Sequence, residues 1–230
     1  MSLITGIFLG MVLFLISFFS DHLYIKNKRP RMQARSFVGG VMMTYIFLEL
    51  IPQSIPTGTE RNIFFAFILI GFSLFHVLEK YIYQHARGVK LRRELKEEHL
   101  VLFVAYHFVI GLILMSLIRN NAIEGVLFFI PVVLHDLLSS TSVHHLYGPI
   151  NKKVNLRSLI SFSSLVGIAF AYYFPLNDII VRAMIALIAG ILTHQVVRDT
   201  IPDHRDGEPA YFIWGVLTMV GFLMLRILAN

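Results

Sequence analysis

The sequence predicts an all-helical membrane protein, and three observations lead to that fold class. Hydrophobic residues make up 56% of the 230 residues and charged residues only 15%, whereas a soluble domain carries about 25% charged residues. Several apolar runs approach or exceed about 18 residues, which is long enough for a helix to cross a bilayer. Basic residues collect in alternate loops, as the topology of a polytopic membrane protein requires.

Eight apolar segments give the expected transmembrane helices of a single domain that covers residues 1–230. They lie at roughly 2–24, 35–55, 62–85, 98–118, 121–147, 157–174, 178–201 and 209–229. The first segment lacks the basic start and the A-x-A-like site of a signal peptide, so we expect it to remain as a helix. The charged stretch 87–98 before the fourth segment is the one substantial connector. Its mixed charge favours a solvated connector, and the alternative is an extension of a helix into the cytoplasm.

The basic residues assign a side to each loop. Of the 20 Lys and Arg residues, sixteen fall near 25–36, 80–98 and 148–157 and in the turn after the seventh segment. The other four are on the opposite side, namely Arg61, Arg119, Arg182 and Arg226. Because cytoplasmic loops carry the excess of positive charge, we expect the larger group in the cytoplasm. Both termini are then expected outside the cytoplasm, in a plasma (inner) membrane.

An internal repeat relates the second segment to the seventh. Gly39-Gly40 is followed after eight residues by Glu49-Leu50-Ile51-Pro52, and Ala189-Gly190 is followed after eight residues by Asp199-Thr200-Ile201-Pro202. The two segments are expected to run in opposite directions across the bilayer, which is the inverted repeat of many transporters. Small residues that pack helices and prolines that end them could give this spacing by chance. Three matched features favour the repeat.

Buried polar residues mark a candidate functional centre. His135 and Asp136 adjoin each other about 16 Å from the outer end of the fifth segment at helical rise. His107 lies about 14 Å from the inner end of the fourth segment, and His194 in the seventh is somewhat nearer the cytoplasm. Ionisable groups at such depths usually face a bundle interior or a water-filled path.

These residue types suit a divalent metal ion. Imidazole and carboxylate are ligands for zinc and similar metals. We therefore predict a metal site from His107, His135 and Asp136, with Ser139 as a weak oxygen ligand and His194 as a further imidazole. A single buried histidine is more often a hydrogen-bonded structural residue, so the prediction depends on convergence of several groups.

Other chemistries find no matching motif. The chain has no Cys, so disulfides and thiolate metal sites are excluded. It contains no phosphate loop, no ATP-binding motif and no H-E-x-x-H zinc-protease motif. We therefore expect neither an enzyme nor an organic cofactor. The net charge of +6 follows from basic cytoplasmic loops and needs no nucleic-acid partner.

The sequence resembles the ZIP family of divalent-metal transporters over nearly its whole length. Gly39-Gly40 with Glu49-Leu50-Ile51-Pro52 resembles that family's second-helix pattern, Leu78-Glu79-Lys80 resembles the end of its third helix, and Ala189-Gly190 with Asp199-Thr200-Ile201-Pro202 resembles its seventh-helix pattern. The resemblance implies eight spans, outside termini and a metal ion as the substrate.

The two metal motifs depart from the family. In the fourth-helix motif H-N-x-x-D/E-G, matched on Gly111, Tyr106 replaces the histidine, His107 the asparagine and Ile110 the acid. The fifth-helix motif H-E-x-P-H-E keeps only its first pair in kind, as His135 and Asp136. The resemblance therefore implies at most one metal site, without the bridging acids of a two-metal centre.

The first functional interpretation is transport of a divalent cation such as zinc through this site. Neutral imidazole is the form that binds metal, so binding should weaken as pH falls. An alternative is a non-transporting relative with structural or metal-sensing groups. A third interpretation, an intramembrane metal-dependent hydrolase, needs three strong ligands and an open position for water. Expected partners are the metal ion, the lipid bilayer and a second copy of the chain in a homodimer.

The charge pattern makes a testable prediction about topology. The loops around Arg29, Arg92 and Lys152 should be cytoplasmic, and the loop near Gly58 should be outside together with Asn230. Because the chain has no Cys, single introduced cysteines can report the side of each loop to a membrane-impermeant thiol reagent. Labelling of a cysteine near position 58 from the cytoplasm alone would reverse the assignment.

Overall fold

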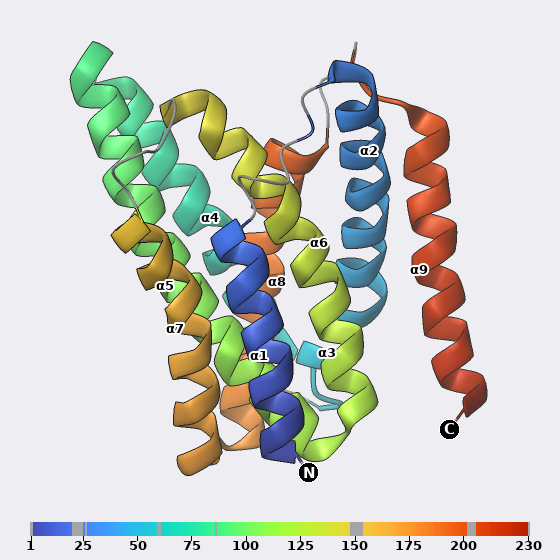
Figure 1. The fold of residues 1–230 in the computed structure, drawn as a ribbon. Helices are drawn as coiled ribbons and strands as arrows, with labels where there is room; N and C mark the ends of the chain where they lie inside the picture. The colour runs from blue at the N-terminus through green and yellow to red at the C-terminus, as the bar shows by residue number, and fades with distance from the viewer. Residues whose placement is uncertain are drawn as a thin grey trace.

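The computed structural model describes residues 2–19, 25, 27–58, 61–85, 87–147, 154–201 and 206–229. Within 88–100, 139–147 and 154–158, and at a few single positions such as 199, it describes the backbone alone. The described residues form a bundle of long helices and contain no strand (Figure 1). The expected all-helical fold class is confirmed for this part of the chain.

The helices follow the apolar segments in order. They are α1 (Ser2–Phe19), α2 (Lys28–Tyr45), η2 (Ile46–Leu50), α3 (Ile51–Ser54), α4 (Arg61–His85), α5 (Gly88–Asn120), α6 (Ala122–Tyr147), α7 (Val154–Tyr173), α8 (Asp178–Gln195), η3 (Val196–Thr200) and α9 (Pro209–Ala229). In the described residues, five stretches are long and apolar enough to cross a membrane: Lys28–Ser54, Arg61–His85, Val101–Asn120, Asp178–Arg198 and Pro209–Leu228. The apolar helices Leu3–Phe19 and Ser161–Tyr173 are shorter.

Two of the long helices contain a π-helical turn near their ends. In η2 the Ile51 N–H bonds to the Ile46 carbonyl, and in η3 the Ile201 N–H bonds to the Val196 carbonyl at 2.9 Å. Each bond spans five residues rather than four. In the sequence a proline follows each turn, at 52 and at 202, and a proline has no backbone N–H to donate to the helical hydrogen bond at its position. The wider turns therefore accommodate the predicted proline motifs.

Helices α2 and α9 cross at Gly40 and Gly215, and each glycine lies directly against the backbone of the other helix. A Cβ added at Gly40 would lie 2.2 Å from the Phe212 carbonyl oxygen, and one added at Gly215 would lie 2.0 Å from the Phe37 carbonyl oxygen. No side chain larger than hydrogen fits at either position without separating the helices. The two helices run in parallel, side by side, as Figure 1 shows.

Helices α4 and α8 repeat this crossing. A Cβ at Gly190 would lie 2.0 Å from the Ile68 carbonyl oxygen, and one at Gly71 would lie 2.2 Å from the Leu187 carbonyl oxygen. On α8, the contact residues Gly190 and Leu187 lie 150 residues after their counterparts on α2, Gly40 and Phe37. On α9, the contact residues Gly215 and Phe212 lie 144 residues after their counterparts on α4, Gly71 and Ile68. The α4/α8 pair runs in the opposite direction to the α2/α9 pair (Figure 1).

A third parallel pair, α5 and α7, completes the framework. A Cβ at Gly111 would lie 2.1 Å from the Ser164 carbonyl oxygen, and one at Gly167 would lie 2.2 Å from the Phe108 carbonyl oxygen. The C-terminal half of α5 supplies side chains that are wholly buried, among them Ile110, Ile113, Leu114 and Met115.

The long helices differ in how much of their apolar stretch is buried. Only 17% of this stretch is buried in α4 and α9, against 56–61% in α2, α5 and α8. Helices α4 and α9 are therefore at the periphery.

The paired glycine contacts predict a contrast between two glycines of one helix. Gly215→Ala should destabilise the protein, since overpacking costs about 1–3 kcal/mol and the Phe37 carbonyl cannot move away alone. Gly221→Ala on the same helix meets nothing within 4 Å, and should be neutral or stabilising by up to about 1 kcal/mol through helix propensity. Thermal unfolding in detergent measures both. Equal loss of stability in the two variants would contradict the close crossing.

Candidate functional site

Two adjacent polar side chains on α6 define the centre of the candidate site. His135 has no exposed surface, and Asp136 is 5% exposed. Both lie 13 to 14 residues after Ala122, which places them about 20 Å from the start of α6. Consecutive residues on a helix point about 100° apart, so the two side chains face different neighbours.

Asp136 faces α5 and α1. The Nε2 atom of His107 lies 3.1 Å from Oδ2 of Asp136, and the Ser17 hydroxyl donates to the same oxygen at 3.2 Å. The other ring nitrogen of His107 lies 2.9 Å from the Phe103 carbonyl oxygen. Both partners of the imidazole–carboxylate pair are only 3% exposed in their side chains.

The hydrogen bonds determine how many protons this pair holds. The Phe103 carbonyl can only accept, so Nδ1 of His107 carries a proton. The contact between Nε2 and Oδ2 then requires one more proton between the two atoms. Whether that proton is on the imidazole or on Asp136, the pair as a whole is neutral, which lowers the free-energy cost of burying it.

His135 faces α8 and η3. Its Nε2 atom lies 3.2 Å from Oε1 of Gln195, and its Nδ1 atom lies 3.5 Å from the Thr200 hydroxyl. An amide oxygen only accepts, so Nε2 carries a proton, and the Thr200 hydroxyl either donates to Nδ1 or accepts from it. Gln195 ends α8 and Thr200 ends η3, so the π-helical turn positions one of the partners.

The sequence grouped His107, His135 and Asp136 into one pocket. The structure brings His107 and Asp136 together, and gives His135 partners on the other side of α6. Among the described residues no group of three or more His, Cys, Asp or Glu side chains has the arrangement of a metal site. The three predicted residues thus belong to two polar pairs, His107–Asp136 and His135–Gln195, that meet at α6.

His194 belongs to a separate cluster between α8 and α4. Its Nε2 atom lies 4.0 Å from Oε2 of Glu79, and its ring lies edge-on to those of Phe72 and His76. The same Glu79 oxygen lies 2.6 Å from the Arg198 guanidinium. His194 therefore faces away from His135, although it precedes Gln195 directly.

Ser139 was a predicted ligand, and three further residues of the site were not predicted. The Ser139 and Ser140 side chains lie outside the described residues. Sequence reasoning did not select Ser17, Gln195 and Thr200. Thr200 lies within the predicted repeat motif and Gln195 is next to His194, so there was a reason in the sequence to consider both. Ser17 is a single hydroxyl residue in an apolar run, and nothing in the sequence distinguishes it.

Tyr106 places another polar group in the core next to this centre. The side chain is 2% exposed, and its ring lies edge-on to that of His107 at 5.2 Å between centroids. Its hydroxyl has no hydrogen-bond partner among the described residues. The position is the one that the ZIP-like motif gives to a histidine.

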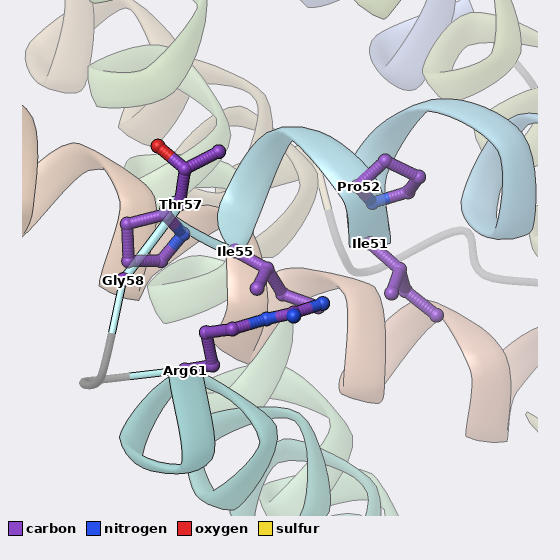
Figure 2. Close-up of a pocket in the computed structure, with 7 residues that line it drawn as sticks. Ile51, Pro52, Ile55, Thr57, Gly58 and Arg61 are labelled. Atoms are coloured by element: carbon purple, nitrogen blue, oxygen red, sulfur yellow. The ribbon is translucent and has the colours of Figure 1, made fainter.

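A cleft of about 580 Å³ lies beside α3, and His135 is not among its lining residues (Figure 2). Its lining consists of Ile51, Pro52, Ile55, Pro56, Thr57, Gly58 and Arg61. Apart from Arg61, these side chains are uncharged, and a guanidinium repels cations. The cleft therefore lacks the ligands of a metal site.

No known family model matches the sequence, and no curated protein matches it.

The contact between His107 and Asp136 predicts energetic coupling. In a double-mutant cycle with His107→Ala and Asp136→Asn, each single change should destabilise the protein, and the double variant should lose less than the sum by about 0.5–3 kcal/mol. The same cycle with His85→Ala in place of His107→Ala is the control, since His85 is exposed and bonds to its own helix. Thermal unfolding in detergent gives the coupling, and additive losses for His107 and Asp136 would contradict it.

Proposed function

We propose that the protein transports a divalent cation such as zinc across a membrane, with the substrate bound at the two polar pairs of α6. The observation that carries this proposal is the burial of His135 and Asp136 beside His107 in the middle of an apolar bundle. Ionisable side chains at such depth mark substrate or ion paths in membrane proteins. Imidazole nitrogen and carboxylate oxygen are the ligands that zinc accepts.

The proposed binding step exchanges a proton for the ion. A cation between Nε2 of His107 and Oδ2 of Asp136 takes the place of the proton that these atoms share, and metal binding releases such protons. His135 faces another side of α6 in this structure, so in this proposal it becomes a further ligand through a rotation of α6 that breaks its hydrogen bonds with Gln195 and Thr200.

The proposal includes eight spans and an inverted repeat that relates α2 with α4 to α8 with α9. Support comes from the constant shifts of 150 and 144 positions between the glycine contacts of the two pairs, and from their opposite directions. Inverted repeats that rock against each other give alternating access to a central site. Both termini lie at the same end of the bundle (Figure 1), and we propose that this end is outside the cytoplasm.

A second candidate is a non-transporting membrane protein of the same fold. It is favoured by the hydrogen bonds that join His107 to Asp136 and His135 to Gln195, together with the lack of a three-residue metal group in the described residues. In that case the pairs tie helices together. An intramembrane metal-dependent hydrolase is less favoured, because it needs three strong ligands and an open position for water, and the described residues contain no group of three such ligands.

Metal flux in sealed vesicles tests the proposal. Purified protein in vesicles should carry radioactive zinc down its gradient, and His135→Ala and Asp136→Asn should each reduce the initial rate at least about tenfold, since each removes a ligand of the transported ion. His85→Ala is the matched control, because it removes an exposed histidine, and it should keep the parent rate.

The outcome separates the two candidates. Equilibrium binding of zinc without flux, or flux that His135→Ala leaves intact in a folded protein, would contradict transport through this site. Binding that persists in His135→Ala and Asp136→Asn would place the ion elsewhere.

A further inference from the structure

Each π-helical turn carries a charged side chain that pairs with the helix packed beside it. Glu49 in η2 pairs with Arg226 of α9, and Arg198 in η3 pairs with Glu79 of α4 at 2.6 Å. In both cases the partner belongs to the helix that crosses at the glycines. In the first pair the π-helical turn carries the acidic residue, Glu49, and in the second it carries the basic residue, Arg198.

The two ion pairs are at opposite ends of the bundle. Glu49 lies where α2 approaches the starts of α6 and α8, because Gln53 contacts Glu124 at 3.5 Å and accepts a hydrogen bond from Arg182 at 2.7 Å. Arg198 lies at the other end of α8, beside the last turns of α4. The centre with His135 is between them along the bundle.

Both pairs are shielded from water. The exposed fractions of the side chains are 25% and 11% for Arg226 and Glu49, and 26% and 16% for Arg198 and Glu79. A surface pair in the same protein, Lys28 with Asp206, has exposed fractions of 67% and 43%. Shielded charges attract more strongly than exposed ones, and breaking one partner of such a pair leaves the other uncompensated.

A π-helical turn can convert these contacts into a switch. It contains one residue more per turn than an α-helix, so closing it to an α-helical turn rotates the following residues by about 100° relative to the preceding ones. A rotation of that size separates Arg198 from Glu79. The same turn carries Thr200, which contacts His135, so a change at His135 is transmitted to Arg198 within three residues.

We propose that the two ion pairs are gates at opposite ends of one path, with Glu49–Arg226 closing the end near the termini and Glu79–Arg198 closing the other. This inference rests on the proposed transport function. Each gate opens by rearrangement of its own π-helical turn, and the inner turn responds to occupancy of His135 through Thr200. With both pairs formed, this conformation is closed at both ends.

Accessibility of one central cysteine tests the gates without any measurement of flux. The reporter is Gln195→Cys, which is 2% exposed in the parent, in a chain that has no other Cys. A membrane-impermeant thiol reagent is added to one side of oriented vesicles at a time. The parent reporter should react slowly from both sides.

Opening one gate should expose the reporter to one side only. Glu79→Gln should raise the labelling rate at least about tenfold from the Glu79 side, and Arg226→Gln should do so from the other side, since loss of a shielded ion pair is worth more than the 1.4 kcal/mol that a tenfold change requires. Asp206→Asn breaks the exposed pair and should change neither rate. The swap Glu79→Arg with Arg198→Glu should restore slow labelling.

These outcomes are decisive for the gates. Faster labelling from both sides in either single variant, or a swap that leaves the reporter open, would show loosened packing and overturn the proposal. Sided labelling of the reporter, with no zinc flux through the parent protein that keeps Gln195, would uphold the gates and reject the transport function. Zinc flux through the parent protein, with the reporter labelled equally from both sides, would support transport and overturn the gates.

Discussion

The close approach of helix backbones is the constraint on which the structure depends. Hydrocarbon gives apolar helices no hydrophobic reason to associate, so packing at small residues has to hold them together. In three parallel pairs, an added Cβ would lie only 2.0–2.2 Å from a carbonyl oxygen of the neighbouring helix. Each pair therefore packs as one unit, and the other helix contacts lie at the surfaces between pairs.

Helix α6 lies at those surfaces, since it contacts α1, α2, α5 and η3. Its two buried polar residues connect different pairs. Asp136 bonds to His107 of the α5/α7 pair, and His135 bonds to Gln195 of the α4/α8 pair. Because consecutive side chains point about 100° apart, α6 is hydrogen-bonded to two helix pairs. Any movement of one pair relative to the other would have to break or exchange these hydrogen bonds.

The positions of the helices could be predicted because the length of an apolar run and the charge of a loop depend only on residues that are adjacent in the sequence. The differences have a physical reason. Helix α5 begins at Gly88 and α2 at Lys28 rather than at 98 and 35, because charged residues that end an apolar run do not end a helix in water. Residues 20–24 of the first expected span lie outside the described residues.

The site could be predicted only in part. Imidazole and carboxylate groups in apolar helices are conspicuous, and matching depth suggested that His107 and Asp136 meet. The partners of His135 could not be found in this way, since Gln195 and Thr200 are ordinary neutral residues whose role depends on how α8 and α6 face each other. Orientation around a helix axis is set by tertiary packing, and a shift of one residue turns a side chain by about 100°.

Charge limits what this centre can hold. Asp136 and Glu49 are the acidic side chains that are buried among the described residues, and Glu49 already pairs with Arg226. In the proposed transport, a divalent cation at Asp136 that displaces the shared proton would keep one uncompensated positive charge, because one carboxylate compensates only one of its two charges. An excess charge in an apolar interior is costly, so under that proposal this centre would bind the ion less tightly than a centre with a second acid.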